Sequence, residues 1–293
     1  MPTAPPPPDS PALSHERHLI RPRAAPRFSI KAHDTADTGP FGSEEDAEPE
    51  LAAARARLAA LQAKLMAEER TGVLVVLQGF DGAGKDHVVR DVIGAMDPAG
   101  VGVHNFKKPS GEEQAHDFLW RFHQRTPARG FVQVFDRSHY EEVIVPRVHD
   151  LESEDDLRAR LESINDFERM LTRESIVVVK LFLHISKDVQ AERVQERLEK
   201  REMHADFSPA DVLEREHWDD YDHAFETMIR ATSTSWAPWH VIPADSRWYA
   251  TTAAALLLVD TLRAIDPRYP GLDPGDLAEA GVKAPEGAVV DGD

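Results

Sequence analysis

The chain has 293 residues, with 34 Lys and Arg against 52 Asp and Glu, and a formal net charge of −18. This balance makes it a poor candidate for coating nucleic acid, because such binding needs Lys and Arg to neutralise phosphates. The lack of cysteine excludes disulfides and thiolate metal sites. No apolar run approaches the roughly 20 residues of a membrane-spanning helix. We therefore expect a soluble, cytoplasmic protein that binds neither nucleic acid nor a membrane.

Residues 1–46 are rich in proline and poor in large apolar side chains. They begin MPTAPPPPDSPALSHERH, without the apolar segment of a secretory signal. A segment of this composition has little apolar surface to bury, so we expect 1–46 to be a mostly disordered tail. The predicted folded domain covers 47–266. The Pro/Gly-rich stretch 267–293 is expected to be a flexible tail.

The folded part begins with a stretch typical of a helix and a stretch typical of a strand. Leucines recur at helical spacing within 50–70. Val73–Leu77 is a continuous apolar run that suits a strand buried on both faces. By the same reasoning we expect further strands at 101–106, 131–135, 175–186 and 239–242, and helices at 88–96, 112–124, 156–173, 189–200, 209–231 and 248–265. Strands separated by helices in this way predict an α/β fold, with a five-stranded parallel sheet and helices on both faces.

The first predicted strand leads into GFDGAGKDH, a glycine-rich turn at the start of a helix. In a phosphate-binding loop, the backbone N–H groups of such a turn surround phosphate oxygens and the lysine reaches the outer phosphates. A glycine turn that only connects two elements is the alternative. Two carboxylates are unusual here: Asp81 lies inside the loop, and Asp86 stands where a Ser or Thr is expected. The predicted phosphate contacts are Gly82, Ala83, Gly84, Lys85 and Asp86, although Asp86 could be only a favourable first-turn acid.

A second acidic residue follows the strand predicted at 131–135. Asp136, directly before Arg137, stands where a phosphate-loop protein needs a carboxylate to orient Mg²⁺. An Asp at a strand end is also a common turn residue or helix cap, and this alternative stays open. Because ligands gather at the carboxyl ends of parallel strands, we expect one site to contain Asp81, Lys85, Lys107 and Asp136.

Seven segments in order, between about Leu51 and Ile265, carry a family pattern. They are GFDGAGKDH, FKKPSGEEQAHDFLWRFHQRTPARG, VFDRSHYEEVIVPRVH, FERML, VKLFLHISKDVQAERVQERLE, FSPADVLEREHWDDY and ATSTSWAPWHVIPADSRWYA. Together they resemble the polyphosphate kinase type 2 family. The resemblance implies a P-loop kinase-like fold with a helical lid at about 190–215, and a homo-oligomer. It also implies reversible, Mg²⁺-dependent phosphoryl transfer between inorganic polyphosphate and nucleoside mono- or diphosphates, with AMP and ADP both open as acceptors.

The resemblance also implies roles for particular residues. Asp81 and Lys85 match the acid and the lysine of the family's Walker A loop, and Asp136 and Arg137 match its Walker B pair. These four are the predicted catalytic residues, and Asp81 and Asp136 are the predicted Mg²⁺ ligands. Further phosphate contacts are implied at Lys107, Lys108, Arg193 and Arg197.

The sequence departs from the family between Arg197 and Phe207, where Ala205 replaces a Trp and Asp206 replaces a Lys. A lid altered in this way could hold a polyanion less tightly, or use Lys200 and Arg201 instead. His87 also replaces a small residue. These differences bear on chain-length preference and efficiency more than on the class of reaction.

Two other functions stay open. The first is an ATP-dependent nucleotide or small-molecule kinase of the same fold, which would use ATP and not polyphosphate. The second is a non-catalytic polyphosphate-binding regulator, which would bind without forming product. Tyr140, Glu141 and Glu142 are open between an acceptor site and a structural role. Four of the five tryptophans, Trp120, Trp218, Trp236 and Trp239, are interpreted as core or interface residues rather than base-stacking platforms.

Overall fold

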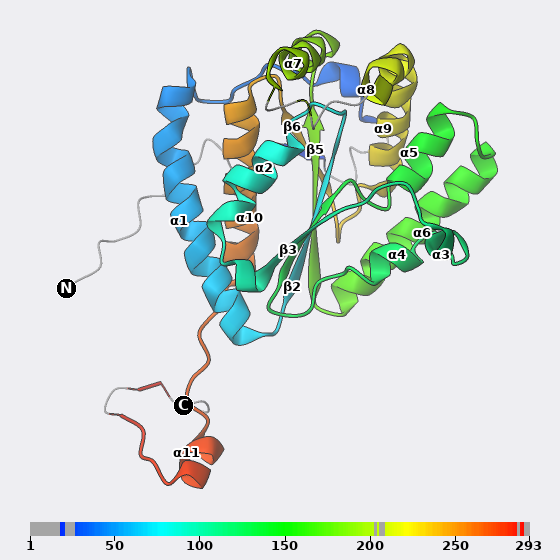
Figure 1. Cartoon of the computed structure of the whole chain (residues 1–293). Helices are drawn as coiled ribbons and strands as arrows, with labels where there is room; N and C mark the ends of the chain where they lie inside the picture. The colour runs from blue at the N-terminus through cyan, green and yellow to red at the C-terminus, as the bar shows by residue number, and fades with distance from the viewer. Residues whose placement is uncertain (1–17, 21–26, 202–203, 205–208, 286–287, 290–293) are drawn as a thin grey trace.

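The structure is a computed structural model that describes residues 18–20, 27–201, 204, 209–285 and 288–289. Its centre is one six-stranded sheet in the order β1-β6-β5-β2-β4-β3. Helices cover both faces of this sheet, as Figure 1 shows. None of the helices in these described ranges is long and apolar enough to cross a membrane.

The predicted five-stranded parallel sheet is confirmed. Its strands are β2 (Gly72–Gly79), β3 (Val101–Asn105), β4 (Val132–Asp136), β5 (Ile176–His184) and β6 (Trp239–Pro243). The register pairs Leu77 of β2 with Asp136 of β4, and Asp136 with Asn105 of β3. The carboxyl ends of these strands therefore lie level at one edge, where their loops can meet.

The helices divide between the two faces of the sheet (Figure 1). One face carries α1 (Glu44–Glu68), α2 (Lys85–Asp91) and α10 (Arg247–Ile265), and the other carries α5 (Glu141–Val148), α6 (Glu154–Arg173) and α9 (Trp218–Thr232). Helix α6 buries Leu157, Leu161 and Ile164 at helical spacing and exposes its acidic side chains, with the exception of the buried Glu168. This arrangement confirms the predicted helices on both faces.

Some predicted helices are divided or displaced. The stretch predicted as a helix at 112–124 forms two short helices, α3 (Gly111–Gln114) and α4 (Trp120–His123). The stretch 209–231 forms α8 (Pro209–Leu213), a 3-10 turn and α9, whereas α7 (Lys187–Glu199) begins two residues before its prediction. Helix α5 is not among the predicted helices, and it contains Pro146, a residue that usually disfavours a helix interior. Within the predicted lid, Ala205, Asp206 and Phe207 lie outside the described residues.

The two predicted tails contain ordered elements. In the C-terminal one, α11 (Pro274–Ala280) lies apart from the sheet (Figure 1). In the N-terminal one, β1 (Leu19–Ile20) pairs antiparallel with β6, and the 3-10 turn η4 (Ile30–Ala32) packs on α9.

The expectation of disorder over 1–46 does not hold for the described part of that segment. Phe28 and Ile30 are buried, so its few apolar side chains are used in packing. Backbone contacts add to this, because Ile30 N donates to Glu226 Oε2 at 2.8 Å and Arg230 Nε donates to Phe28 O at 2.7 Å. Helix α1 begins at Glu44, since Ser43 caps it by accepting from Asp46 N.

We expect the substitution Ile30→Ala to lower the free energy of unfolding by about 2–4 kcal/mol, because it leaves a cavity under the N-terminal segment. Urea denaturation followed by circular dichroism measures this loss. The matched control is Leu151→Ala, at a side chain that is 68% exposed, for which we expect a change within about 0.5 kcal/mol. Equal midpoints for the two variants would contradict the packing of this segment.

Candidate active site

The loop between β2 and α2 has the geometry of a phosphate-binding loop. Gly79 has φ 146°, and a Cβ there would lie 2.5 Å from Leu183 O, so only glycine fits. Gly84, with φ 98°, begins helix α2 and accepts from the N–H groups of the following turn. Lys85 is buried and its Nζ donates to Gly79 O at 3.1 Å and Phe80 O at 3.2 Å. The lysine ammonium is thus held directly against the loop.

The loop after β4 is joined to the phosphate loop by an ion pair. One guanidinium nitrogen of Arg137 lies 2.6 and 2.7 Å from the two carboxylate oxygens of Asp81. Burial alone would lower the pKa of Arg137, but the carboxylates of Asp81, Glu141 and Asp136 outweigh it and raise the pKa, so the guanidinium stays charged. Arg137 also has φ 58°, a left-handed backbone that costs a non-glycine residue about 1–3 kcal/mol. Strain of this kind is typical of functional loops.

Asp136 has one carboxylate oxygen that is bonded and one that is not. Asn105 Nδ2 donates to Asp136 Oδ2 at 3.0 Å. Asp136 Oδ1 is buried and has no hydrogen-bond partner among the described residues. Within the same residues no group of three or more acidic or histidine side chains forms a metal cage. Mg²⁺ usually takes one or two protein carboxylates together with substrate phosphates and water, so Asp136 and the nearby Asp81 fit this ion.

Two cavities meet at this edge of the sheet. The smaller one, about 180 Å³, is lined by the phosphate loop, Asp136, Arg197 and Arg247. The larger one, about 650 Å³, has an aromatic wall and contains Lys107 and Lys108. Both are lined by Asp81, Asn105 and Arg137. Two ligands could therefore bind side by side, with the Arg137–Asp81 pair between them.

Ten of the twelve predicted site residues line these two cavities: Asp81, Gly82, Gly84, Lys85, Asp86, Lys107, Lys108, Asp136, Arg137 and Arg197. His87 Nδ1 lies 3.1 Å from Asp86 Oδ2. Burial alone would raise the pKa of Asp86, but the effects of His87 and Arg197 outweigh burial and lower this pKa. Ala83 is fully buried, and its N–H donates to Phe80 O at 3.0 Å. The N–H of Ala83, which was predicted to contact phosphate, is therefore already used by a hydrogen bond within the turn.

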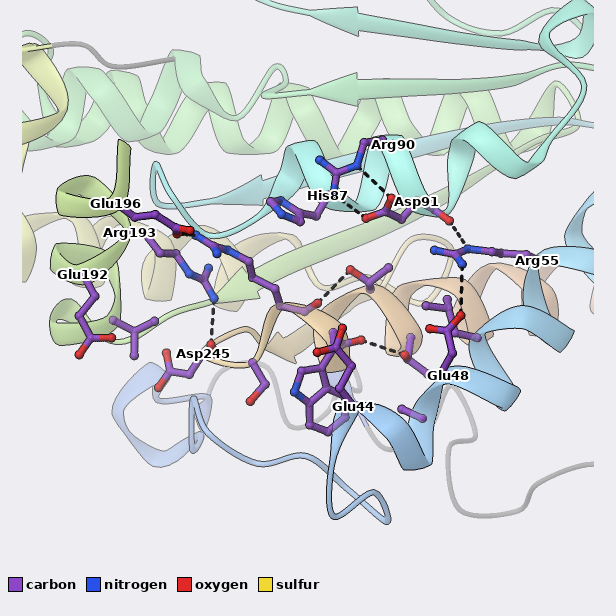
Figure 2. A pocket seen from close by; sticks show the side chains of 18 residues that line it. Glu44, Glu48, Arg55, His87, Arg90, Asp91, Glu192, Arg193, Glu196 and Asp245 are labelled. Atoms are coloured by element: carbon purple, nitrogen blue, oxygen red, sulfur yellow. Dashed lines mark hydrogen bonds and ion pairs between the residues drawn. The ribbon is translucent and has the colours of Figure 1, made fainter. Parts of the chain in front are cut away.

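The structure does not bring Arg193 to these cavities. Its guanidinium donates to Gly82 O at 2.7 Å, and to Ala244 O and Asp245 O at 2.7 and 2.9 Å. It lines a third cavity of about 850 Å³, behind the phosphate loop between α1, α2, α7 and α10, which Figure 2 shows. Four glutamates line this cavity beside its arginines, so it offers a polyanion little net positive charge. Arg193 supports the loop from behind.

Sequence reasoning did not identify Asn105 and Arg247, which line the smaller cavity. A signal for Asn105 was available, because it is the last residue of β3 and lies opposite Asp136 in the register. Arg247 opens α10 after the loop that follows β6, and it pairs with Glu196 at 2.7 Å. It could have been found by the same rule, since its loop also leaves the carboxyl end of a parallel strand.

The loop, the acidic strand end and the parallel sheet define a phosphate-loop protein. Comparison with known proteins narrows this class. The family described as Polyphosphate kinase 2 (PPK2) matches residues 42–270. The chain therefore belongs to the polyphosphate kinase 2 family, as the sequence resemblance predicts.

Individual relatives agree with this assignment. The chain is 44% identical over 245 residues to an AMP/ADP-polyphosphate phosphotransferase of Meiothermus ruber, covering 83% of this chain and 92% of the relative. It is 39% identical to an ADP-polyphosphate phosphotransferase of Rhodopseudomonas palustris, covering 76% and 81%. The crystal structure of polyphosphate kinase 2 from Arthrobacter aurescens TC1 superposes with a TM-score of 0.83 at 42% identity, covering 90% of this chain and 96% of that one.

The two arginines of α7 should behave differently when each is changed to methionine. Arg197→Met removes a cation from the smaller cavity, so we expect about tenfold weaker binding of inorganic tripolyphosphate, measured by calorimetry. Arg193→Met leaves buried carbonyls without a donor, so we expect the free energy of unfolding to fall by about 2–3 kcal/mol. The assignment of Arg197 to the smaller cavity and Arg193 to the support of the loop would be wrong if Arg193→Met weakened tripolyphosphate binding as much as Arg197→Met does and left the unfolding midpoint unchanged.

Proposed function

We propose that this chain catalyses reversible phosphoryl transfer between inorganic polyphosphate and a nucleoside mono- or diphosphate. The observation that carries the proposal is the meeting of two cavities at Asp81, Asn105 and Arg137. A kinase that draws on a polymer must hold two separate polyanions with their phosphates adjacent. Membership of the polyphosphate kinase 2 family, and relatives named as AMP- and ADP-polyphosphate phosphotransferases, support the same substrates.

The smaller cavity suits the phosphates at the point of transfer. Four basic side chains line it, which are Lys85, Arg137, Arg197 and Arg247. The backbone of the phosphate loop adds N–H donors and the positive end of α2. We assign Lys85 and Arg137 to the transferred phosphoryl group, because both line the smaller cavity and Arg137 lies where the two cavities join. Arg197 would hold phosphates further along the donor.

The larger cavity suits a nucleoside. Trp218 stacks on Phe80 with ring centroids 3.8 Å apart, and Tyr221 and Phe225 pack around this pair. Apolar walls with a few polar groups at the mouth are typical of sites for small organic ligands. Trp218 therefore has a role beyond the predicted core packing, whereas Trp239 is fully buried as a core residue. Lys107 and Lys108 place positive charge in the same cavity for the acceptor phosphates.

Catalysis by this arrangement rests on positioning and charge neutralisation. The acceptor is a phosphate that is already ionised at neutral pH, so no strong general base is required. Asp81 then orients Arg137 and the acceptor phosphate. Asp81 and Asp136 would hold Mg²⁺, which would supply positive charge to offset the negative charge of the phosphates. The cytoplasmic location, the homo-oligomer and the lack of nucleic-acid binding stay predictions from the sequence.

Turnover should depend on three charged residues that line the smaller cavity, Lys85, Asp136 and Asp81. We expect Lys85→Ala, Asp136→Asn and Asp81→Asn each to reduce kcat by about 100-fold or more, because each removes a charge that positions a phosphate. The assay incubates the protein with Mg²⁺, polyphosphate and AMP, ADP, GMP or GDP, and separates the nucleotides by chromatography. Normal turnover by Asp136→Asn would contradict the assignment of this carboxylate.

The same assay separates the other functions. An ATP-dependent kinase would form product with ATP and none with polyphosphate as the donor. A polyphosphate-binding regulator would bind tripolyphosphate in calorimetry and give no product in any mixture. Either result would refute the proposed function.

The aromatic wall can be tested separately from the phosphate site. We expect Trp218→Leu to raise the KM for the nucleotide about tenfold, because a stacked aromatic surface is lost, and to leave the KM for polyphosphate unchanged. Trp236→Leu is the control, since Trp236 is 36% exposed and does not line this cavity. Equal KM values for the nucleotide in both variants would place the nucleoside elsewhere.

A further inference from the structure

A buried polar cluster lies next to the loop that carries Asp136 and Arg137. Its fully buried members are His139 and Tyr140 from that loop, Glu168 from α6 and Lys180 from β5. Lys180 lies inside the sheet, where it pairs with Val76 of β2 on one side and Trp239 of β6 on the other. A charged side chain at this place is costly to bury unless it is fully paired.

The cluster satisfies this lysine completely. Lys180 Nζ donates to Tyr140 OH at 2.9 Å, to Glu168 Oε2 at 2.7 Å and to Thr232 O at 2.7 Å. These three acceptors use all three N–H groups of the ammonium. Tyr140 OH in turn donates to Glu168 Oε1 at 2.7 Å, and His139 Nε2 lies 3.2 Å from the same oxygen. The carboxylate therefore has partners on both oxygens.

The motif TSTSWAPWH forms the far side of the cluster. The carbonyl of Thr232 accepts from Lys180. The hydroxyl of Thr232 accepts from Trp239 Nε1 at 2.9 Å. Ser233 Oγ accepts from Trp239 N at 3.0 Å. This segment lines neither of the two site cavities at these residues. The carbonyl of Thr232 joins the cluster, and the hydroxyls of Thr232 and Ser233 fix Trp239 beside it.

The pKa values of Lys180 and Glu168 are both lowered, but for different reasons. Burial lowers the pKa of Lys180 in spite of the opposing effect of Glu168. Burial alone would raise the pKa of Glu168, but Lys180 and His139 outweigh it and lower the pKa. Burial, together with the charge of Glu168, raises the pKa of Tyr140, so its hydroxyl stays protonated and donates. The cluster is an ion pair bridged by a phenol.

Stability alone does not account for such a cluster, because an apolar pair of similar volume is often equally or more stable than a buried ion pair. What the ion pair adds is a fixed geometry between separate segments. It ties the loop after β4 to α6, to β5 and to the end of α9. Only three residues lie between Asp136 and Tyr140, and one of them is the left-handed Arg137.

We infer that Tyr140, Glu168 and Lys180 are positioning residues, which fix the loop 136–140 so that Arg137 meets Asp81 between the two cavities. A strained backbone persists only where its surroundings determine it, and this cluster supplies a buried anchor on the carboxyl side of Arg137. The inference rests on the proposed phosphoryl transfer for its effect on rate. Its effect on the loop itself does not depend on that function.

The test is Tyr140→Phe, which removes one hydroxyl and keeps the ring. We expect kcat for polyphosphate-dependent phosphorylation to fall between about 10- and 100-fold through misplacement of Arg137, with the KM for both substrates unchanged. We also expect faster amide hydrogen exchange at residues 136–140, measured by mass spectrometry. A wild-type protein without turnover would defeat the proposed function, whereas the exchange measurement would still test the anchor.

Tyr249→Phe is the matched control. Tyr249 belongs to α10, away from this loop, and is equally buried. Its hydroxyl lies 3.1 Å from His18 Nε2. We expect it to leave kcat and the exchange of residues 136–140 unchanged. If Tyr140→Phe gave the same kcat and the same exchange as Tyr249→Phe, the positioning role would be overturned.

A double variant tests the same anchor through its charged members. Lys180→Met with Glu168→Leu removes both charges at similar volume but leaves Thr232 O and the Tyr140 hydroxyl without these partners, so we expect the free energy of unfolding to fall by about 1–3 kcal/mol. We also expect kcat of the folded protein to fall by at least about tenfold, because Tyr140 loses both anchors. Wild-type kcat in this variant would also overturn the inference.

Discussion

The ion pair between Arg137 and Asp81 is the contact on which the geometry of the site depends. Asp81 belongs to the loop after β2, and Arg137 to the loop after β4, so the pair connects two strand ends that are neighbours in the sheet. It also separates the two cavities, because both residues line each of them. The position of the pair therefore sets where the two ligands would meet. Features behind the loops, such as Arg193 and the cluster around Lys180, are best understood as supports for this contact.

The sheet explains why these particular residues can meet at all. Parallel strands in level register bring their carboxyl ends to one edge, and Asn105, Asp136 and Leu77 are aligned there. Close contact between the loops also needs backbone conformations that most residues avoid. Gly79 supplies one of them without cost, whereas Arg137 adopts another at a cost in strain. The strain is borne at the residue whose guanidinium must point toward Asp81, which is why a glycine cannot replace it.

Sequence reasoning could predict the parts of this arrangement that follow from local pattern. Apolar runs and glycine spacing predicted the five parallel strands and the phosphate loop, and the rule for strand ends predicted that Asp81, Lys85 and Asp136 would meet. Directions of side chains do not follow from such patterns. Arg193 and Arg197 share one face of α7 at four-residue spacing, yet Arg193 donates to carbonyls behind the loop and Arg197 lines the smaller cavity. The packing of Phe28 and Ile30 could not be predicted from the amino-acid composition of the N-terminal segment. Two apolar side chains are enough to hold the segment in place because α9 supplies polar partners for their backbone groups.

The acidic phosphate loop lies in a cavity of mixed charge. The chain as a whole is strongly acidic, at −18, so a polyanion is repelled by most of its surface and attracted only where basic side chains concentrate. The smaller cavity gathers four basic side chains but also three carboxylates, which are Asp81, Asp86 and Asp136. A wholly basic cavity would hold one polyanion tightly and gain nothing when a second one arrives. With carboxylates inside it, a Mg²⁺ ion held as proposed by Asp81 and Asp136 would supply part of the positive charge. Strong neutralisation would then be available when the substrates are assembled, which is when transfer requires it.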